Sequence, residues 1–338
     1  MNKVPAKVAS EILSVIDRSD KVLLHLHPSP DADSIGSALA VSNWLKQVGK
    51  KVTLIKGDSD LPREFGVLPG FEMISEENFS EVDQSGYDLF LILDSSSLDR
   101  VTNLNPVVFH GHLKTVVIDH HADNLGFGDI NLINEKASAT AEIIYELFDI
   151  WRVPITKEVA ICLLVGLYGD TGSFQFPNTT ARTFSIASAL VEKCPGFSEV
   201  LEALRSNRHP DWVAYQGLAF SNLLMYQKMA VSVVPYQEIE RRGFTRETIG
   251  EQNVANTLIL VRDWLVGVSV SEKEPGVSRV SLRSRKPEVY DVSKIAQVFG
   301  GGGHKAASGA QIMSSAQDAG NELMQAIAGI YPDLLEEI

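Results

Sequence analysis

Four short motifs of aspartate and histidine follow apolar runs in this sequence. In chain order they are His27-Pro28-Ser29-Pro30-Asp31-Ala32-Asp33, Asp94, Asp119-His120-His121 and Asp170-Thr171-Gly172. Four strand ends or loops in this order can bring carboxylates and imidazoles to one point, and such a set binds hard or borderline divalent metals. Because paired cations activate water, the pattern indicates a metal-dependent hydrolase.

The aspartates provide the main physical argument for two metal ions. Asp31, Asp33, Asp94 and Asp170 together carry four negative charges, which two divalent cations would cancel. Without metal, four clustered carboxylates would repel one another and some would have to take up protons. Asp94 ends a wholly apolar run, where a buried carboxylate is costly unless it is paired or bound to a cation, and it best suits a ligand shared by both ions.

Each of these aspartates also has an ordinary structural interpretation. Asp33 can cap a helix that starts at Ser34, and His27 can be a hydrogen-bonded histidine at a strand end. Asp94 can cap a helix together with the serines that follow it. Only the combination of the motifs favours metal binding over these alternatives.

Adjacent histidines at a strand end give the sharpest local signal. His120 and His121 face different directions, so one can bind metal while the other faces a substrate. A metal-binding histidine usually donates its second ring nitrogen to a carboxylate, and Asp119 is available for this. Two core histidines brought together by chance are the alternative.

A second group of candidate residues lies toward the C-terminal end. Glycines 300–303, which include Gly301, Gly302 and Gly303, are followed by His304, and their free N–H groups can approach an anion as phosphate-binding loops do. A flexible helix exit is the structural alternative. Arg283 and Arg285 alternate on one face of a predicted strand and suit bidentate phosphate contacts; exposed arginines of an edge strand are the alternative.

The elements that must position these residues alternate between strand and helix patterns. This alternation predicts an α/β domain over residues 1–197, with a parallel sheet flanked by helices. Ligands at the carboxyl ends of parallel strands are where such sheets place their sites. The predicted strands are 22–26, 51–56, 87–93 and 113–118, and the predicted helices are 35–48, 137–151, 156–168 and 179–192.

A smaller α+β domain is expected over residues 229–338, after a helical linker over 198–228. Its strands are predicted at 230–235, 265–271 and 279–283, and its helices at 254–263, 292–299 and 316–330. Residues 276–305 carry six basic side chains and two acidic ones, against the acidic balance of the whole chain. This stretch is therefore expected to face an anion.

Composition narrows the functional classes. The chain has 338 residues and a formal charge of −13, which disfavours non-specific binding to long duplex nucleic acid. No apolar stretch is long enough for a membrane span and the N-terminus lacks a secretory signal, so a soluble cytoplasmic protein without membrane partners is expected. The two cysteines, Cys162 and Cys194, have no metal-binding spacing and form no disulfide framework.

The five ordered motifs resemble the DHH/DHHA1 phosphoesterase family, in its nanoRNase and pAp-phosphatase branch. The resemblance spans nearly the whole chain: the four acidic motifs resemble the DHH motifs, and residues 300–309 resemble the DHHA1 signature of the smaller domain. Ser34 and Ser308 stand where many relatives carry alanine, a departure that could alter substrate fit.

This resemblance implies a pair of Mn²⁺ ions, with Mg²⁺ as the alternative. It implies that one ion is held by His27, Asp31 and Asp94, and the other by Asp33, Asp94, His120 and Asp170. His121, with Asp119 beside it, would act on the scissile phosphate or the leaving oxygen, and Arg283, His304 and the glycines would hold the terminal nucleotide.

The function predicted on this basis is hydrolysis of short single-stranded oligoribonucleotides to 5′-mononucleotides, with removal of the 3′-phosphate of pAp as a second activity. Alternatives are a phosphodiesterase for linear or cyclic dinucleotides, a polyphosphate or pyrophosphate hydrolase, and a nucleotide-binding regulator without turnover. The oligomeric state, including a homodimer, stays open.

Overall fold

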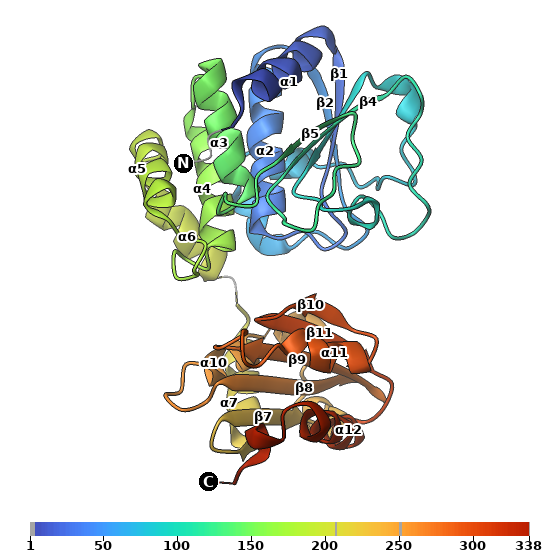
Figure 1. Ribbon diagram of the computed structural model, residues 1–338, viewed down its shortest axis with the longest axis vertical. Coiled ribbons are helices and arrows are strands. Elements are labelled where there is room, and N and C mark those ends of the chain that lie inside the picture. The colour runs from blue at the N-terminus through green and yellow to red at the C-terminus, as the bar shows by residue number, and fades with distance from the viewer. Residues whose placement is uncertain (1–3, 207, 250–251, 338) are drawn as a thin grey trace. The chain divides into compact units, whose positions relative to one another are not determined.

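The computed structural model describes residues 4–206, 208–249 and 252–337 (Figure 1). The chain divides into two compact units, Met1–Asn207 and Arg208–Ile338. Each unit has its own sheet and its own hydrophobic core. In the described part of the chain, no helix combines the length and apolar character needed to cross a membrane.

The first unit is built on a five-stranded parallel sheet, which confirms the predicted α/β class. Its strand order is β2-β1-β3-β4-β5, and every neighbouring pair is parallel. Strand β3 is buried along its whole length, as expected for a central parallel strand covered on both faces. The strands are β1 (Lys21–His25), β2 (Lys51–Ile55), β3 (Leu89–Leu93), β4 (Lys114–Asp119) and β5 (Ile130–Ile133).

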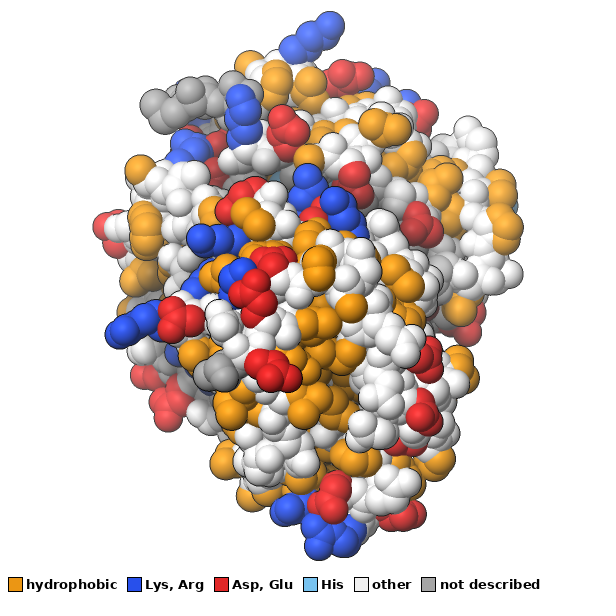
Figure 2. All heavy atoms as spheres, turned by 60° about the horizontal axis from the view of Figure 1, so that its bottom comes forward, with side chains coloured by type: hydrophobic (Ala, Val, Ile, Leu, Met, Phe, Trp, Pro, Cys, Tyr) orange, Lys and Arg blue, Asp and Glu red, His pale blue; other side chains and the backbone are white. Residues whose placement is uncertain are grey.

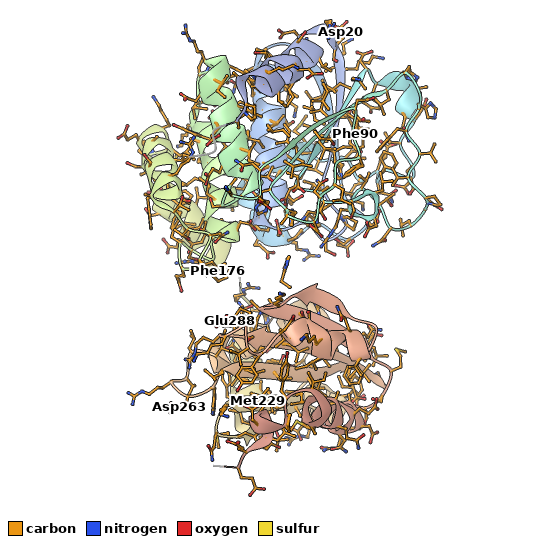
Figure 3. The ribbon with its side chains drawn as sticks, in the orientation of Figure 1. Asp20, Phe90, Phe176, Met229, Asp263 and Glu288 are labelled. Atoms are coloured by element: carbon orange, nitrogen blue, oxygen red, sulfur yellow. The ribbon has the colours of Figure 1, made fainter. Side chains whose placement is uncertain are left out.

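The two faces of this sheet are covered differently. One face packs against helices, with Leu24 and Leu91 of the sheet in the same core as Ile12 and Ile144 of the helices. The other face, around Phe90, packs against aromatic side chains from the long connections between strands (Figure 3). The helices are α1 (Ala6–Arg18), α2 (Ala32–Gln47), α3 (Thr140–Trp151), α4 (Lys157–Asp170), α5 (Ala181–Lys193) and α6 (Phe197–Arg205), and the connections carry short 3₁₀ turns at Arg63–Val67, Phe71–Met73, Gln84–Gly86 and Leu98–Arg100.

Helices α2 and α4 approach each other closely because glycine lines their contact. A Cβ atom on Gly166 would lie 2.8 Å from Oδ1 of Asp33 and 2.9 Å from the Cβ of Ala141, and a Cβ on Gly169 would collide with Ala32. Only residues without a side chain let the two backbones come this near. The close approach matters for the site, because Asp33 lies at the start of α2 and Asp170 ends α4.

The second unit contains a six-stranded mixed sheet with the order β10-β11-β9-β8-β7-β6. The pair β7–β8 is parallel and the other pairs are antiparallel. One face packs against α11 and α12, and the other face packs against α7 to α10. The elements are α7 (Pro210–Ser221), β6 (Leu223–Met225), β7 (Met229–Val234), α8 (Tyr236–Arg241), α9 (Arg246–Ile249), α10 (Val254–Leu258), β8 (Val266–Glu274), β9 (Val277–Ser284), α11 (Val292–Val298), β10 (Gly302–His304), β11 (Ala307–Ile312), α12 (Ala316–Ile330) and a 3₁₀ turn at Pro332–Leu335.

The segment 198–228, expected as a helical linker, is divided between the two units. Helix α6 packs Val200 and Leu204 against the first core, whereas α7 buries Tyr215 and Leu218 in the second unit. The boundary between the units lies at Asn207 and Arg208. The apolar residues of these helices do not by themselves tell which core they contact.

Glu272 is the buried carboxylate that ties the second unit together. It accepts backbone hydrogen bonds from Tyr236 (3.2 Å), Gly276 (2.8 Å) and Ala316 (3.0 Å), which belong to three different segments. Glu272→Ala is expected to lower the free energy of unfolding by about 2–4 kcal/mol, since buried N–H groups then lose their acceptor. Urea unfolding measures this, with the exposed Glu288→Ala as the control.

The same contacts predict that the stability of the second unit depends on pH. Burial alone would raise the pKa of Glu272, but the three donated hydrogen bonds lower it below its ordinary value. The carboxylate therefore stabilises the fold at pH values above its unfolded pKa, and this contribution is lost as the pH falls through the lower folded pKa. Equal acid sensitivity of the wild type and Glu272→Gln would contradict this assignment.

Candidate metal centre

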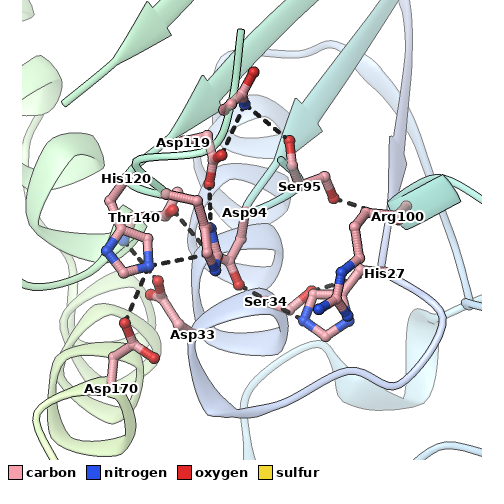
Figure 4. Close-up of polar contacts among 12 residues, drawn as sticks. His27, Asp33, Ser34, Asp94, Ser95, Arg100, Asp119, His120, Thr140 and Asp170 are labelled. Carbon is pink, nitrogen blue, oxygen red and sulfur yellow. Dashed lines mark hydrogen bonds and ion pairs between the residues drawn. The ribbon is translucent and has the colours of Figure 1, made fainter. Parts of the chain in front are cut away.

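The carboxyl ends of three neighbouring strands meet at one edge of the first sheet (Figure 4). His27 and Asp31 follow β1, Asp94 follows β3, and His120 follows β4. Parallel strands that end at the same edge deliver their following residues to one place, where open α/β sheets carry their sites. Asp170, the last residue of α4, reaches the same place from the side of the helices.

The first cluster of possible metal ligands consists of His27, Asp31 and Asp94. Nε2 of His27 lies 3.8 Å from Oδ2 of Asp31 and 3.7 Å from Oδ2 of Asp94. Asp31 also caps helix α2, because its Oδ1 accepts the N–H groups of Asp33 and Ser34. Its second oxygen faces the imidazole, so capping and ligation use different atoms of one carboxylate.

The second cluster consists of Asp33, His120 and Asp170. Nε2 of His120 lies 3.1 Å from Oδ2 of Asp170. Asp33 is fully buried and accepts hydrogen bonds from the N–H groups of Thr140 (2.6 Å) and Ala141 (3.0 Å) at the start of α3. In each of the two clusters, one ligand atom per residue lies within 4.8 Å of the others.

Asp94 belongs to the first cluster and also faces the second one. Its Oδ2 faces His27, while its Oδ1 lies 3.6 Å from Nε2 of His120. The residue is only 3% exposed and has a left-handed backbone conformation with φ 54°, which is uncommon for a residue with a side chain. Such strain is typical of functional sites, where the surrounding structure imposes it. Thr140 fixes the carboxylate by donating from Oγ1 to Oδ1 at 3.1 Å.

His121 is held by a carboxylate of its own. Its Nδ1 lies 2.8 Å from Oδ1 of the fully buried Asp119, whose other oxygen accepts a hydrogen bond from Nδ2 of Asn124 at 2.7 Å. Nδ1 of His121 is also 3.8 Å from Asp94, and a third possible ligand group therefore joins Asp94, His120 and His121. The ring nitrogen that does not contact Asp119 remains available for chemistry.

The electrostatics of the cluster reflect crowded negative charge. Burial and the neighbouring carboxylates raise the pKa of Asp94 well above its ordinary value, and burial and Asp170 raise the pKa of Asp33 to about 7. Burial lowers the pKa of His120, but its hydrogen bond to Asp170 and the charge of Asp33 outweigh this and raise it to about 9. Bound cations would relieve this repulsion, and mixed carboxylate and imidazole donors suit borderline divalent metals.

Several residues that support the site were not among the sequence candidates. Thr140 orients Asp94, Asn124 orients Asp119, and the N–H groups of Thr140 and Ala141 hold Asp33. The only signal in the sequence is that Thr140 lies at the start of a predicted helix. Nothing in the sequence distinguishes Asn124 from an ordinary loop asparagine.

The C-terminal candidates lie in the second unit, and the structure gives several of them a structural use. Gly301 has no room for a side chain beside the carbonyl of Gly309, and Gly302 to His304 form strand β10, which pairs with β11. Arg283 is partly buried on β9 and donates to the carbonyl of Leu282. The guanidinium of Arg285 donates to carbonyls of the loop 259–262.

Residues 21–167 match the family model "DHH family, N-terminal domain". The bifunctional oligoribonuclease and PAP phosphatase NrnA of Thermus thermophilus is 28% identical over 98% of this chain and 94% of its own length. NrnA of Bacillus subtilis is 26% identical over 90% of this chain and 93% of its own, and a probable NrnA of Streptococcus mutans is 29% identical over 91% and 94%.

Solved structures share the fold. An exopolyphosphatase-related protein from Bacteroides fragilis superimposes with a TM-score of 0.89 at 22% identity, over 99% of both chains. The exonuclease RecJ bound to manganese gives a TM-score of 0.52 at 14% identity, over 98% of this chain and 96% of its own. Together with the relatives, the fold and the site define a hydrolase of phosphoester bonds. Residues 21–167 form a DHH-family N-terminal domain, and the chain is similar to the NrnA relatives over nearly its whole length.

Proposed function

We propose that this protein is a cytoplasmic enzyme that hydrolyses the phosphodiester bonds of short single-stranded oligoribonucleotides to 5′-mononucleotides, and that the same site removes the 3′-phosphate of pAp. The observation that carries the proposal is the pair of ligand clusters joined through Asp94. The names of the nearly full-length NrnA relatives support the substrate class.

The residues present suit a pair of divalent cations, and we take Mn²⁺ as the resident metal, with Mg²⁺ as the alternative. His27, Asp31 and Asp94 would hold one ion, and Asp33, Asp94, His120 and Asp170 the other. When bound, such ions supply activation of the attacking water and stabilisation of the charge that develops on the phosphoryl oxygens.

His121 is the residue we assign to proton transfer. Asp119 accepts a hydrogen bond from Nδ1 of its ring, so Nε2 is the nitrogen that faces a substrate. The buried Asp119, itself fixed by Asn124, holds the ring of His121 in one orientation. A proton on Nε2 would go to the departing oxygen, and general acid catalysis of this kind contributes about 10²–10⁴-fold.

Residues of the second unit supply the positive charge that a short nucleotide needs. Arg283 and His304, with the N–H groups of Gly301, Gly302 and Gly303, are assigned to the terminal phosphate, because guanidinium groups and glycine backbones suit phosphate oxygens. Arg283 keeps its charge even though burial and Arg279 lower its pKa. Arg285 is also assigned to phosphate binding because it lies two residues after Arg283. Its guanidinium already donates three hydrogen bonds to backbone carbonyls.

The charge of the chain supports a small substrate rather than a long duplex. The formal charge is −13, and acidic and basic side chains are intermingled on the face drawn in Figure 2. Binding of long duplexes depends on many phosphate contacts with basic side chains. A short anion held by cations and a few arginines has no such requirement.

A panel of substrates tests the proposal. The protein is incubated with RNAs of two to ten nucleotides, pAp, cyclic dinucleotides and polyphosphate, each with Mn²⁺ or Mg²⁺, and the products are separated by chromatography. The expected result is release of 5′-mononucleotides from the shortest RNAs, strongest with Mn²⁺, and of phosphate from pAp. Cleavage of polyphosphate alone, or tight binding of nucleotides without turnover, would contradict it.

A further inference from the structure

A broad groove lies in the second unit at the end of the sheet where β9 finishes. The groove is open to solvent and has a volume of about 710 Å³. Two aromatic side chains line it, Tyr226 before β7 and Trp264 before β8, and both are partly exposed. Neither residue is used by the metal centre or by the phosphate contacts assigned above.

The groove is basic although the chain is acidic. Arg262, Arg285 and Lys286 contribute three positive charges to its lining, against one negative charge from Asp263. A further lining residue, Lys228, is already paired with Asp333 at 2.9 Å. Aromatic rings beside unneutralised arginine and lysine are the combination that binds single-stranded nucleic acid, because bases stack on the rings while phosphates meet the cations.

The structure holds this groove in a fixed shape. The guanidinium of Arg285 donates to the carbonyls of Ile259 and Val261, and of Arg262. Its backbone N–H also donates to the carbonyl of Leu265 at 2.8 Å. These contacts fasten the loop that carries Arg262 and Trp264 to the end of β9, so a bound strand would meet a preformed surface.

The groove lies at the end of the sheet that carries the phosphate-binding candidates, because Arg285 in its lining follows Arg283 by two residues. Arg283 pairs with Ala307 of β11 and with Gly267 of β8, and the hairpin of β10 and β11 carries His304. Strands lie about 4.8 Å apart in a sheet, so β11 and β8 are separated by about 10 Å. An RNA molecule whose terminal nucleotide is bound at His304 and Arg283 would therefore reach the groove by crossing the end of the same sheet.

We propose that this groove binds the part of a single-stranded oligonucleotide that extends beyond the reacting end, with bases against Trp264 and Tyr226 and phosphates beside Arg262 and Lys286. The inference rests on the proposed function and deepens it, because it assigns recognition of RNA longer than a dinucleotide to a separate surface. Dinucleotides and pAp have no such extension and are handled without the groove.

The test measures RNA binding apart from turnover. Binding of a fluorescent eight-nucleotide RNA is followed by anisotropy in EDTA, where no cleavage occurs, and cleavage of a dinucleotide with Mn²⁺ is measured separately. Three variants are compared with the wild type. Arg262→Ala with Lys286→Ala removes two charges, Trp264→Leu removes the stacking surface but keeps apolar contact with the core, and Arg241→Ala with Arg242→Ala removes two exposed charges elsewhere in the same unit.

The two groove variants should each bind the eight-nucleotide RNA about tenfold more weakly, since stacking contributes ~1–3 kcal/mol per base. In the charge variant, the slope of log Kd against log salt should fall by about 1.4, the value for two lost phosphate contacts on a single strand. The control pair and all rates on the dinucleotide should match the wild type.

Three results would contradict the proposal that this groove binds RNA. They are unchanged binding in both groove variants, no binding of the eight-nucleotide RNA by the wild type, or a loss of dinucleotide cleavage in proportion to the loss of binding. Failure of the proposed function is a different result, namely a wild type that binds the RNA through the groove but cleaves neither RNA nor dinucleotide.

Discussion

Asp94→Asn is expected to lower turnover of a dinucleotide by about 10³-fold or more. The two oxygens of Asp94 face different sides of the centre, His27 on one side and His120 on the other. Removing its charge weakens both proposed cation sites at once. Metal ions contribute several kcal/mol of charge stabilisation to phosphoryl transfer, and about 4 kcal/mol corresponds to a factor of 10³ in rate.

Two measurements accompany the rate. Calorimetric titration with Mn²⁺ should give two bound ions for the wild type and fewer for Asp94→Asn. Without metal, the variant should melt at the same or a higher temperature, because neighbouring carboxylates raise the pKa of Asp94 and asparagine relieves that repulsion. Asp99→Asn, at an exposed position five residues on, is the control. An unchanged turnover rate in Asp94→Asn would contradict the assignment of Asp94 as a ligand shared by both cations.

The strand ends of the first unit could be predicted because burial leaves a clear pattern in the sequence. The run Leu89–Leu93 is apolar at every position, which is typical of a strand covered on both faces, and the polar residue that follows it must lie at the edge of the sheet. The same reasoning applies to β4 and His120. The parallel order of the strands then brings these edge residues together.

Contacts that depend on packing between distant segments could not be predicted. Asp33 is held by α3, more than a hundred residues later in the chain, and this contact requires Gly166 to let α4 lie close to α2. Alternation along the sequence predicts that Arg285 binds phosphate, yet where its guanidinium points depends on the loop 259–262. A pattern of hydrophobic or charged residues predicts which face of a helix or strand is buried. Which other element packs against that face is set by the tertiary structure.

The boundary between the two units also depends on contacts between distant segments. Two sheets and two cores were expected from the change of pattern along the chain, but the limits of each unit depend on which core α6 and α7 contact. The apolar residues of a helix carry no mark of the core that they contact.

His121→Ala is expected to lower kcat on a dinucleotide by about 10²–10⁴-fold, the usual contribution of a general acid. Metal binding should remain, because His121 is held mainly by Asp119, whereas His120 belongs to a cluster with Asp33 and Asp170. His120→Ala should therefore lose affinity for Mn²⁺, and His110→Ala, at an exposed histidine, should behave as the wild type.

The leaving group separates the two roles open to His121. A phosphodiester that releases p-nitrophenolate needs no proton on its departing oxygen, so the defect of His121→Ala should shrink to within about tenfold on that substrate if the imidazole acts as the acid. An equal defect on both substrates, together with the loss of one bound Mn²⁺, would instead make His121 a metal ligand in the group with Asp94 and His120. Asp119→Asn should show a smaller form of the same leaving-group dependence, since Asp119 acts by holding the ring in place.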